Sequence, residues 1–367
     1  MYSIFYACLV VFLCVGCEGQ EDQKANLSPN SFTSLSMETV FEFTESEEVA
    51  FRTISSIKTD NHGNILVLDF WQPYLYMFDK EGNFLEKIGR EGRGPGEFEQ
   101  ISSFLVDREN LWVIDSSSLK IEKFEYSDDT YIHIKTIPLG SDELAGKILG
   151  KIDRGFLILK SFTLTAGSKE NPTVHLVTSI DENGEILRDS IVSVPIAEQM
   201  TLQAGENKLI GNKLFGNESL LAFNGINYIY TLWTNSLSIE SYSIDGLHKH
   251  AFSHVIQPVY ITGVEKDSIS SKYGLYRSDL RRKMPNVKPV VNDLLIDDNQ
   301  RIWVELFTSG LGHAWFGFTK NGEALYKIEI PKKGAELQEI VGNRVIWNYQ
   351  NEEGAPTFIV SKIDMQY

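Results

Sequence analysis

A four-strand pattern that repeats about every 46 residues constrains the fold of this chain most strongly. Residues 54–57 recur as residues 101–104, and residues 65–69 recur as residues 111–115. Each copy is rich in strand-forming residues and contains tight turns with Asp, Asn or Gly, which reverse the chain between short strands. Four short antiparallel strands repeated at a period in the forties are typical of a β-propeller blade.

The later copies predict six blades. A third spans residues 147–194, a fourth runs from about Lys208 to Asp245, and a fifth spans residues 290–330. The last copy, residues 337–363, has only three strands, and we expect residues 35–43 to supply the fourth. This pairing closes the ring and covers two strand edges that would otherwise be open. The predicted fold is therefore an all-β, six-bladed propeller of four-stranded blades, closed by an N-terminal strand joining the last blade.

Between the first two blades lies a glycine-rich stretch, residues 89–98, with the pattern Gly-Arg-x-Gly-x-Gly-Pro-Gly-Glu-Phe. With this stretch, the Asp-x-x-Gly turns and the Arg-Ile-Trp-Val strand at residues 301–304, the chain resembles NHL-like six-bladed propeller lipoproteins of the Bacteroides type. The resemblance covers about residues 32–365. It implies an architecture and no fixed activity, because these motifs connect blades and the group supports many functions.

The N-terminus predicts export. Residues 4–15 form an apolar run that is too short to span a bilayer and fits a signal peptide, which we expect to occupy residues 1–16. Residues 13–17 resemble a lipobox, so Cys17 is predicted to carry lipid; the alternative is a plain secretory leader. Residues 17–31 are polar and suit a flexible tether to a propeller at residues 32–367. We therefore expect an outer-membrane lipoprotein of the bacterial cell envelope, either periplasmic or surface-exposed.

Charge and cysteine content exclude several classes of function. The net charge of −16 without a basic block argues against nucleic acid as a partner. All three cysteines lie at or before Cys17, so the body of the chain has no disulfide, thiolate nucleophile or cysteine-bound metal.

The candidate ligand-binding residues lie in the long loops of one propeller face. In the insert at residues 246–289, we expect a helix from Asp267 or Ser268 to Lys283, weakened at Gly274. It forms either a basic, aromatic flap over the channel that contacts an anionic or sugar ligand, or a solvated helix packed on the blade rims. The remaining candidates either contact a ligand or join neighbouring blades. The full predicted ligand-binding set is Trp71, Tyr74, Arg90, Arg93, Tyr273, Arg277 and Arg281.

The sequence contains no catalytic motif such as a nucleophile elbow, a Walker loop or His-Glu-x-x-His. The leading hypothesis is a non-catalytic module, without cofactor, that binds or scaffolds a carbohydrate, peptide or protein partner. The alternative is a metal-dependent hydrolase, lactonase or lyase, with a divalent cation such as calcium in the central channel. Its ligands would come from residues near first strands, such as Asp153, Asn212, Asn292 and Asp293.

Overall fold

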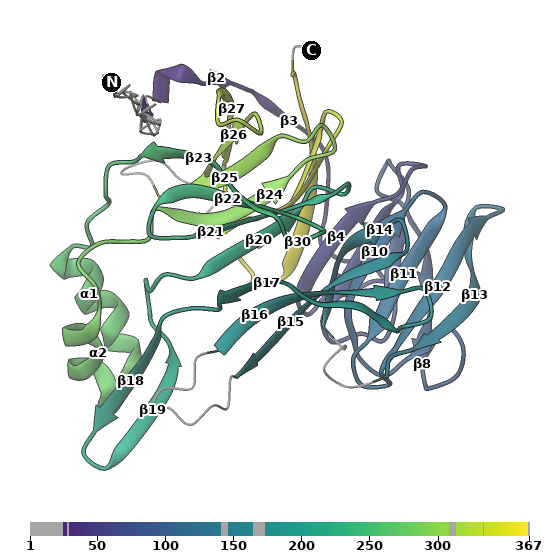
Figure 1. Cartoon of the computed structure of the whole chain (residues 1–367), viewed down its shortest axis with the longest axis horizontal. Helices are drawn as coiled ribbons and strands as arrows, with labels where there is room; N and C mark the ends of the chain where they lie inside the picture. Colours follow the sequence, from purple (N-terminus) through teal and green to yellow (C-terminus); the bar gives the residue numbers. More distant parts are fainter. Residues whose placement is uncertain are drawn as a thin grey trace, which may run out of the picture.

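The computed structural model describes residues 25–27, 29–140, 146–163, 173–307, 313–332 and 334–365, and the statements below refer to these residues. Cys17 lies outside the described residues, so its lipidation stays a prediction. The chain forms the predicted six-bladed β-propeller (Figure 1).

Each blade is a four-stranded antiparallel sheet whose first strand lies at the centre of the ring. From the inside outward, blade one contains β4 (Ile54–Thr59), β5 (Ile65–Asp69), β6 (Leu75–Phe78) and β7 (Phe84–Ile88), and blade two contains β10 (Ile101–Asp107), β11 (Asn110–Asp115), β12 (Lys120–Ser127) and β13 (Thr130–Pro138). Blade three contains β14 (Lys147–Ile152), β15 (Gly155–Thr163), β16 (Thr173–Asp181) and β17 (Ile186–Pro195), and blade four contains β20 (Ser219–Phe223), β21 (Tyr228–Trp233), β22 (Leu237–Ser243) and β23 (His248–Val255). Blade five contains β24 (Val291–Ile296), β25 (Ile302–Leu306), β26 (His313–Phe318) and β27 (Ala324–Ile330), and blade six contains β28 (Glu336–Val341), β29 (Arg344–Gln350), β30 (Pro356–Ile363) and β3 (Met37–Phe43).

The predicted ring closure is confirmed. Strand β3 pairs antiparallel with β30, with Phe43 opposite Phe358. The ring of Phe43 also lies 4.8 Å from that of Phe78 in blade one. The N-terminal strand therefore completes blade six and packs against the next blade, so one element joins both ends of the propeller.

A short N-terminal strap, residues 25–34, precedes β3 and runs along two further blades. Its strand β1 (Ala25–Asn26) pairs in parallel with β23 of blade four, and β2 (Thr33–Ser34) pairs in parallel with β27 of blade five. The turn η1 (Pro29–Ser31) lies between them. Phe32 is buried between the two blades, with its ring 4.9 Å from that of Phe316. Part of the segment predicted as a tether therefore contacts the propeller.

Blade four differs from its prediction. It spans Ser219 to Val255, because the pattern near Lys208 belongs to a separate hairpin of β18 (Gln199–Ala204) and β19 (Asn207–Asn212). Sequence alternation identifies a strand but does not show which sheet the strand joins.

The helical insert also differs from its prediction. The helix α1 (Gly263–Ser270) begins earlier than Asp267, because Thr262 and Glu265 form a capping box. The predicted weak point is present: Gly274 has φ 49° and ψ −120° within the turn η3 (Ser271–Tyr276), which separates α1 from α2 (Arg277–Lys283). Among the described residues, no helix is long and apolar enough to cross a membrane.

Candidate functional site

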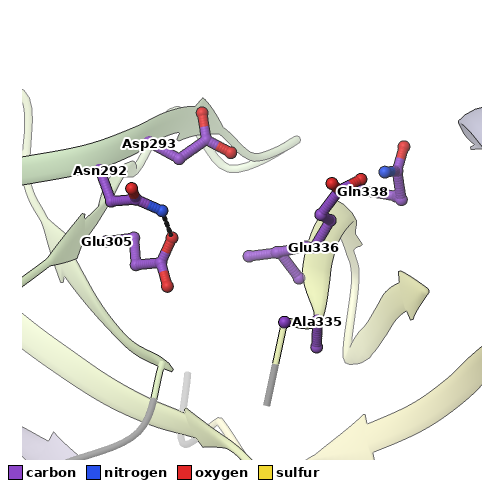
Figure 2. A pocket seen from close by; sticks show the side chains of 8 residues that line it. Asn292, Asp293, Glu305, Ala335, Glu336 and Gln338 are labelled. Carbon is purple, nitrogen blue, oxygen red and sulfur yellow. Dashed lines mark hydrogen bonds between the residues drawn. The ribbon is translucent and has the colours of Figure 1, made fainter. Parts of the chain in front are cut away.

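A pocket of about 340 Å³ opens between blades five and six, at the ends of the blades that carry the long connecting loops. The pocket lies between the innermost strands β24 and β28 of the two blades. Figure 2 shows Asn292, Asp293 and Glu305 on one side of the gap and Glu336 and Gln338 on the other. Gly334, Ala335 and Leu337 complete the lining.

Backbone bulges direct the polar side chains of the pocket. The pairing of β24 with β25 shifts register at Asn292, and that of β28 with β29 shifts at Gln338. Similar shifts occur near the start of the innermost strands in blades one, two and three. A bulge adds one residue to a strand and changes the direction of its side chain. The bulges in blades five and six therefore place the amides of Asn292 and Gln338 on opposite sides of the gap.

Hydrogen bonds hold both amides in place. The Asn292 side-chain amide donates to the buried Glu305 carboxylate. Gln338 Nε2 donates to Asn348 Oδ1 at 2.7 Å, and Gln338 Oε1 accepts from the Ile57 backbone amide at 3.3 Å. The pocket wall is therefore tied to blade one as well as to blade six.

The electrostatics of the pocket centre on Asp293. Burial raises the pKa of this carboxyl to about 7, and the nearby carboxylates of Glu305, Glu336 and Glu218 act in the same direction. The Leu294 backbone amide donates to Asp293 Oδ1 at 2.7 Å and partly offsets these effects. Glu218 directly precedes β20, so acidic groups from three consecutive blades influence one carboxyl.

The candidate metal ligands only partly come together. Asn292 and Asp293 share the pocket, whereas Asp153 follows β14 at the opposite end of its blade. Asn212 ends β19 and accepts a hydrogen bond from Gln199 at 2.7 Å. Among the described residues, no three His, Cys, Asp or Glu side chains are grouped to hold a metal ion.

The two arginines of the glycine-rich loop form exposed ion pairs. Arg90 pairs with Glu97 at 2.8 Å, and Arg93 pairs with Glu99 at 2.7 Å. Both pairs lie within the segment between blades one and two, and the two arginine side chains are largely exposed, so their role stays a prediction.

A buried lysine holds the same loop from beneath. Lys120 Nζ donates to the backbone carbonyls of Gly94 and Glu97, both at 2.8 Å, and pairs with the fully buried Glu122 at 2.6 Å. His133 Nε2 lies 2.6 Å from the other Glu122 oxygen. Sequence reasoning missed this network, because Lys120 and Glu122 lie in a strand that also contains the charged residues Lys123 and Glu125.

The aromatic candidates of blade one differ in exposure. Trp71 is 58% exposed, and the Arg52 guanidinium lies 5.4 Å from its ring centroid. Tyr74 is partly buried, with its hydroxyl 3.4 Å from that of Tyr76 and with Lys87 Nζ 4.8 Å from its ring centroid. Trp71 is therefore the more accessible of the two.

The candidates of the insert lie far from those of blade one. Arg281 pairs with Asp267 at 2.5 Å, Arg277 is exposed, and Tyr273 packs against the cluster of Leu202 and Leu280. Figure 1 shows α2 at the left of the molecule and β8 (Arg90–Glu91) at the right. The structure therefore does not gather the seven predicted ligand-binding residues into one site. It also adds Glu305, Glu336 and Gln338, which the sequence analysis did not select.

Comparison with known proteins supports the fold. A family model, DUF5128, described as a 6-bladed beta-propeller, matches residues 23–193. A search of curated proteins found no match. A Bacteroides fragilis protein named as a candidate exported protein is 17% identical, with a TM-score of 0.49 over 90% of this chain and 95% of that one.

Two further solved structures resemble the chain at lower identity. A DUF4221 family member from Bacteroides vulgatus is 9% identical, with a TM-score of 0.48 over 91% of this chain and 99% of that one. Regucalcin from Agrobacterium tumefaciens, a calcium-binding protein, is also 9% identical, with a TM-score of 0.43 over 92% and 97% of the two chains. At these values the likenesses carry no argument about ligand or activity. The chain is a six-bladed β-propeller that is similar, over residues 23–193, to the DUF5128 family.

Proposed function

We propose that this protein is a non-catalytic binding module of the bacterial cell envelope, and that its pocket holds a Lys or Arg side chain of a peptide or protein partner. One observation carries the proposal: five amide and carboxyl side chains from two blades converge on a pocket of about 340 Å³. Pockets with a few convergent polar groups are the default binding sites of such scaffolds.

The chemistry of the lining favours a cationic group. Asp293, Glu305 and Glu336 accept hydrogen bonds when ionised, and the Asn292 and Gln338 amides also offer carbonyl oxygens. Hydrogen bonds between a guanidinium or ammonium group and a carboxylate are stronger than neutral ones. The net charge of −16 would also attract a basic partner at long range.

Binding is a better explanation of this lining than covalent catalysis. Among the described residues that line the pocket, none carries a hydroxyl, thiol, imidazole or amine that could act as a nucleophile. The wall is also fixed by hydrogen bonds to blades five, six and one, which suits a preformed receptor.

One observation favours an enzyme as the second candidate. A carboxyl with a pKa of about 7, such as Asp293, is suited to general acid or base catalysis near neutral pH. A hydrolase or lyase of this kind would use Asp293 with Glu336 across the pocket.

Calorimetric titration tests the proposal with peptides that carry one central Lys or Arg, compared with the same peptides carrying Glu. We expect the basic peptides alone to bind, and Asp293→Asn or Glu336→Gln to weaken binding roughly 10-fold or more, the usual effect of losing a charged hydrogen bond. Glu353→Gln, an exposed change in the β29–β30 turn, is the matched control. Equal binding of the wild type and both pocket variants would exclude this site. Turnover of a hydrolase substrate that is lost in Asp293→Asn would instead support the enzyme.

A further inference from the structure

An accessory lobe projects from the propeller and is formed by the β18–β19 hairpin region, residues 199–216, and the helical insert, residues 256–289 (Figure 1). The lobe has its own small core, with Leu202 of the hairpin packed against Leu280 and Met284 of the insert. The Gln203 backbone amide also donates to Asp279 at 2.8 Å, which ties the hairpin to α2. The inner surfaces of the hairpin and helices are therefore occupied by each other.

Large apolar side chains remain on the outer surface of the lobe. Val264 is 80% exposed and Ile210 is 69% exposed, although both are aliphatic. The other large apolar residues exposed on the lobe are Leu209, Tyr260 and Leu275. Several such residues on one small lobe indicate an interaction surface, whereas scattered single ones do not.

The lobe also carries a charge opposite to that of the propeller. Its two segments contain nine Lys or Arg and four Asp or Glu, a net charge of +5, so the rest of the chain carries −21. Lys208, Lys272 and Arg277 are exposed and form no ion pair among the described residues. Exposed apolar and basic side chains together are typical of surfaces that bind anionic membranes.

The N-terminal strap contacts the strand from which the chain enters this lobe. Asn26 of the strap pairs with Val255, and the seven residues after Val255 lead directly into α1. Seven residues lie between Cys17 and Ala25, so the eight Cα–Cα steps that join them span at most about 29 Å. A lipid on Cys17 would therefore hold the strap and the adjoining edge of blade four close to the bilayer.

We propose that the accessory lobe is a second membrane contact, in which Lys208, Lys272 and Arg277 bind anionic headgroups while Ile210, Val264 and Leu275 enter the interface. This inference rests on the proposed envelope location and does not depend on the ligand of the pocket. Two contacts, the lipid and the lobe, would fix how the propeller faces the membrane, which a single flexible anchor cannot do.

This inference is tested by measuring amide exchange of the mature lipoprotein on vesicles. The vesicles consist of phosphatidylcholine alone or of phosphatidylcholine with one third phosphatidylglycerol. We expect exchange in residues 199–216 and 256–289 to slow at least threefold in the anionic vesicles only. The variant Lys272→Gln/Arg277→Gln should lose this protection, whereas the control Arg154→Gln, an exposed charge in a blade-three turn, should keep it. Asp293→Asn should also keep it, which separates the lobe from the pocket.

Two results would overturn the inference. One is equal exchange of the lobe in both kinds of vesicle. The other is protection that appears only when a second protein is added, which would assign the lobe to a protein partner. If Cys17 is not lipidated, the lobe can still be tested by sedimenting the Cys17→Ala protein with anionic vesicles, where Val264→Ser/Leu275→Ser should lower the bound fraction and the exposed control Leu85→Ser should not. Equal sedimentation of these proteins would likewise exclude the membrane contact.

Discussion

Asp293 is the residue whose environment differs most from that of an ordinary surface carboxyl. Its burial beside Glu305 and Glu336 raises its pKa to about 7, so the folded protein retains a proton that the unfolded chain loses near pH 4. Ionisation of Asp293 therefore lowers the free energy of unfolding. Such perturbed carboxyls are common among residues retained for binding rather than for stability.

Replacing Asp293 by Asn should reveal this loss of stability, because the difference in the free energy of unfolding between the two proteins should depend on pH. Below about pH 4 the two proteins should be similarly stable, because Asp293 is protonated in both the folded and the unfolded wild type. Between about pH 4 and pH 7 the wild type should lose stability relative to Asp293→Asn, and above pH 7 the variant should be more stable by roughly 2 to 4 kcal/mol. Urea unfolding across this pH range measures the difference. A constant difference at all pH values would show that the carboxyl titrates normally.

Lys120 of β12 is the residue that stabilises the glycine-rich loop. Lys120→Met should destabilise the fold by roughly 3 to 5 kcal/mol, because it leaves the buried Glu122 without its ammonium partner and removes the donor to the loop carbonyls. The double variant Lys120→Met/Glu122→Gln should recover part of this loss. Arg90→Ala, which breaks only an exposed pair, is the control and should cost less than about 1 kcal/mol. Equal effects of Lys120→Met and Arg90→Ala on urea unfolding would contradict the assigned roles.

At the scale of elements, the N-terminal strap adds short strands to the outer edges of two blades before β3 completes a third. Strand pairs of two residues stabilise little by themselves, so Phe32, buried against Phe316 and Phe318, must provide most of the attachment. The strap therefore depends on one side chain.

Phe32→Ala should lower the free energy of unfolding by roughly 3 to 5 kcal/mol, the usual cost of deleting a buried aromatic ring. It should also speed amide exchange in β1 and β2. Phe70→Ala is the matched control, because the Phe70 side chain is about half exposed. Unchanged exchange in the strap of Phe32→Ala would mean that backbone pairing alone holds it.

The sequence predicts elements better than it predicts the sites between them. The repeat identified the six-bladed ring and its closing strand, although not the bounds of blade four, because strand alternation and turn residues are local signals. The bulges at Asn292 and Gln338 depend on pairing between strands, and the sequence showed neither. Asn292 and Asp293 were recognised as candidate ligands, whereas Glu336 was not selected. The pocket between blades five and six depends on how the two blades pack in the ring, which the pattern of a single strand does not show.

At the scale of the whole molecule, the charge is divided between an acidic propeller and a basic lobe. The charge of −21 on the rest of the chain would repel an anionic membrane and attract a basic partner, while the +5 of the lobe would do the reverse. The proposed contact of the lobe would therefore turn the lobe toward the bilayer.

Cys17→Ala should release the protein from the membrane fraction of cells at high salt, because the lobe alone provides a salt-sensitive contact. Cell fractionation at low and high ionic strength, with labelling by a fatty-acid analogue, measures this. A wild-type protein that takes up no label, or a variant that stays with membranes in high salt, would contradict the predicted anchor.

The central claim, that the pocket receives a cationic group, is tested most directly by the pKa of Asp293, measured by carbon NMR of its side-chain carboxyl. The free protein should titrate near pH 7, and a saturating Arg or Lys peptide should lower this pKa by one unit or more, because a bound cation favours the ionised carboxylate. A pKa near 4 in the free protein, or a pKa that does not change when the peptide is bound, would contradict the claim.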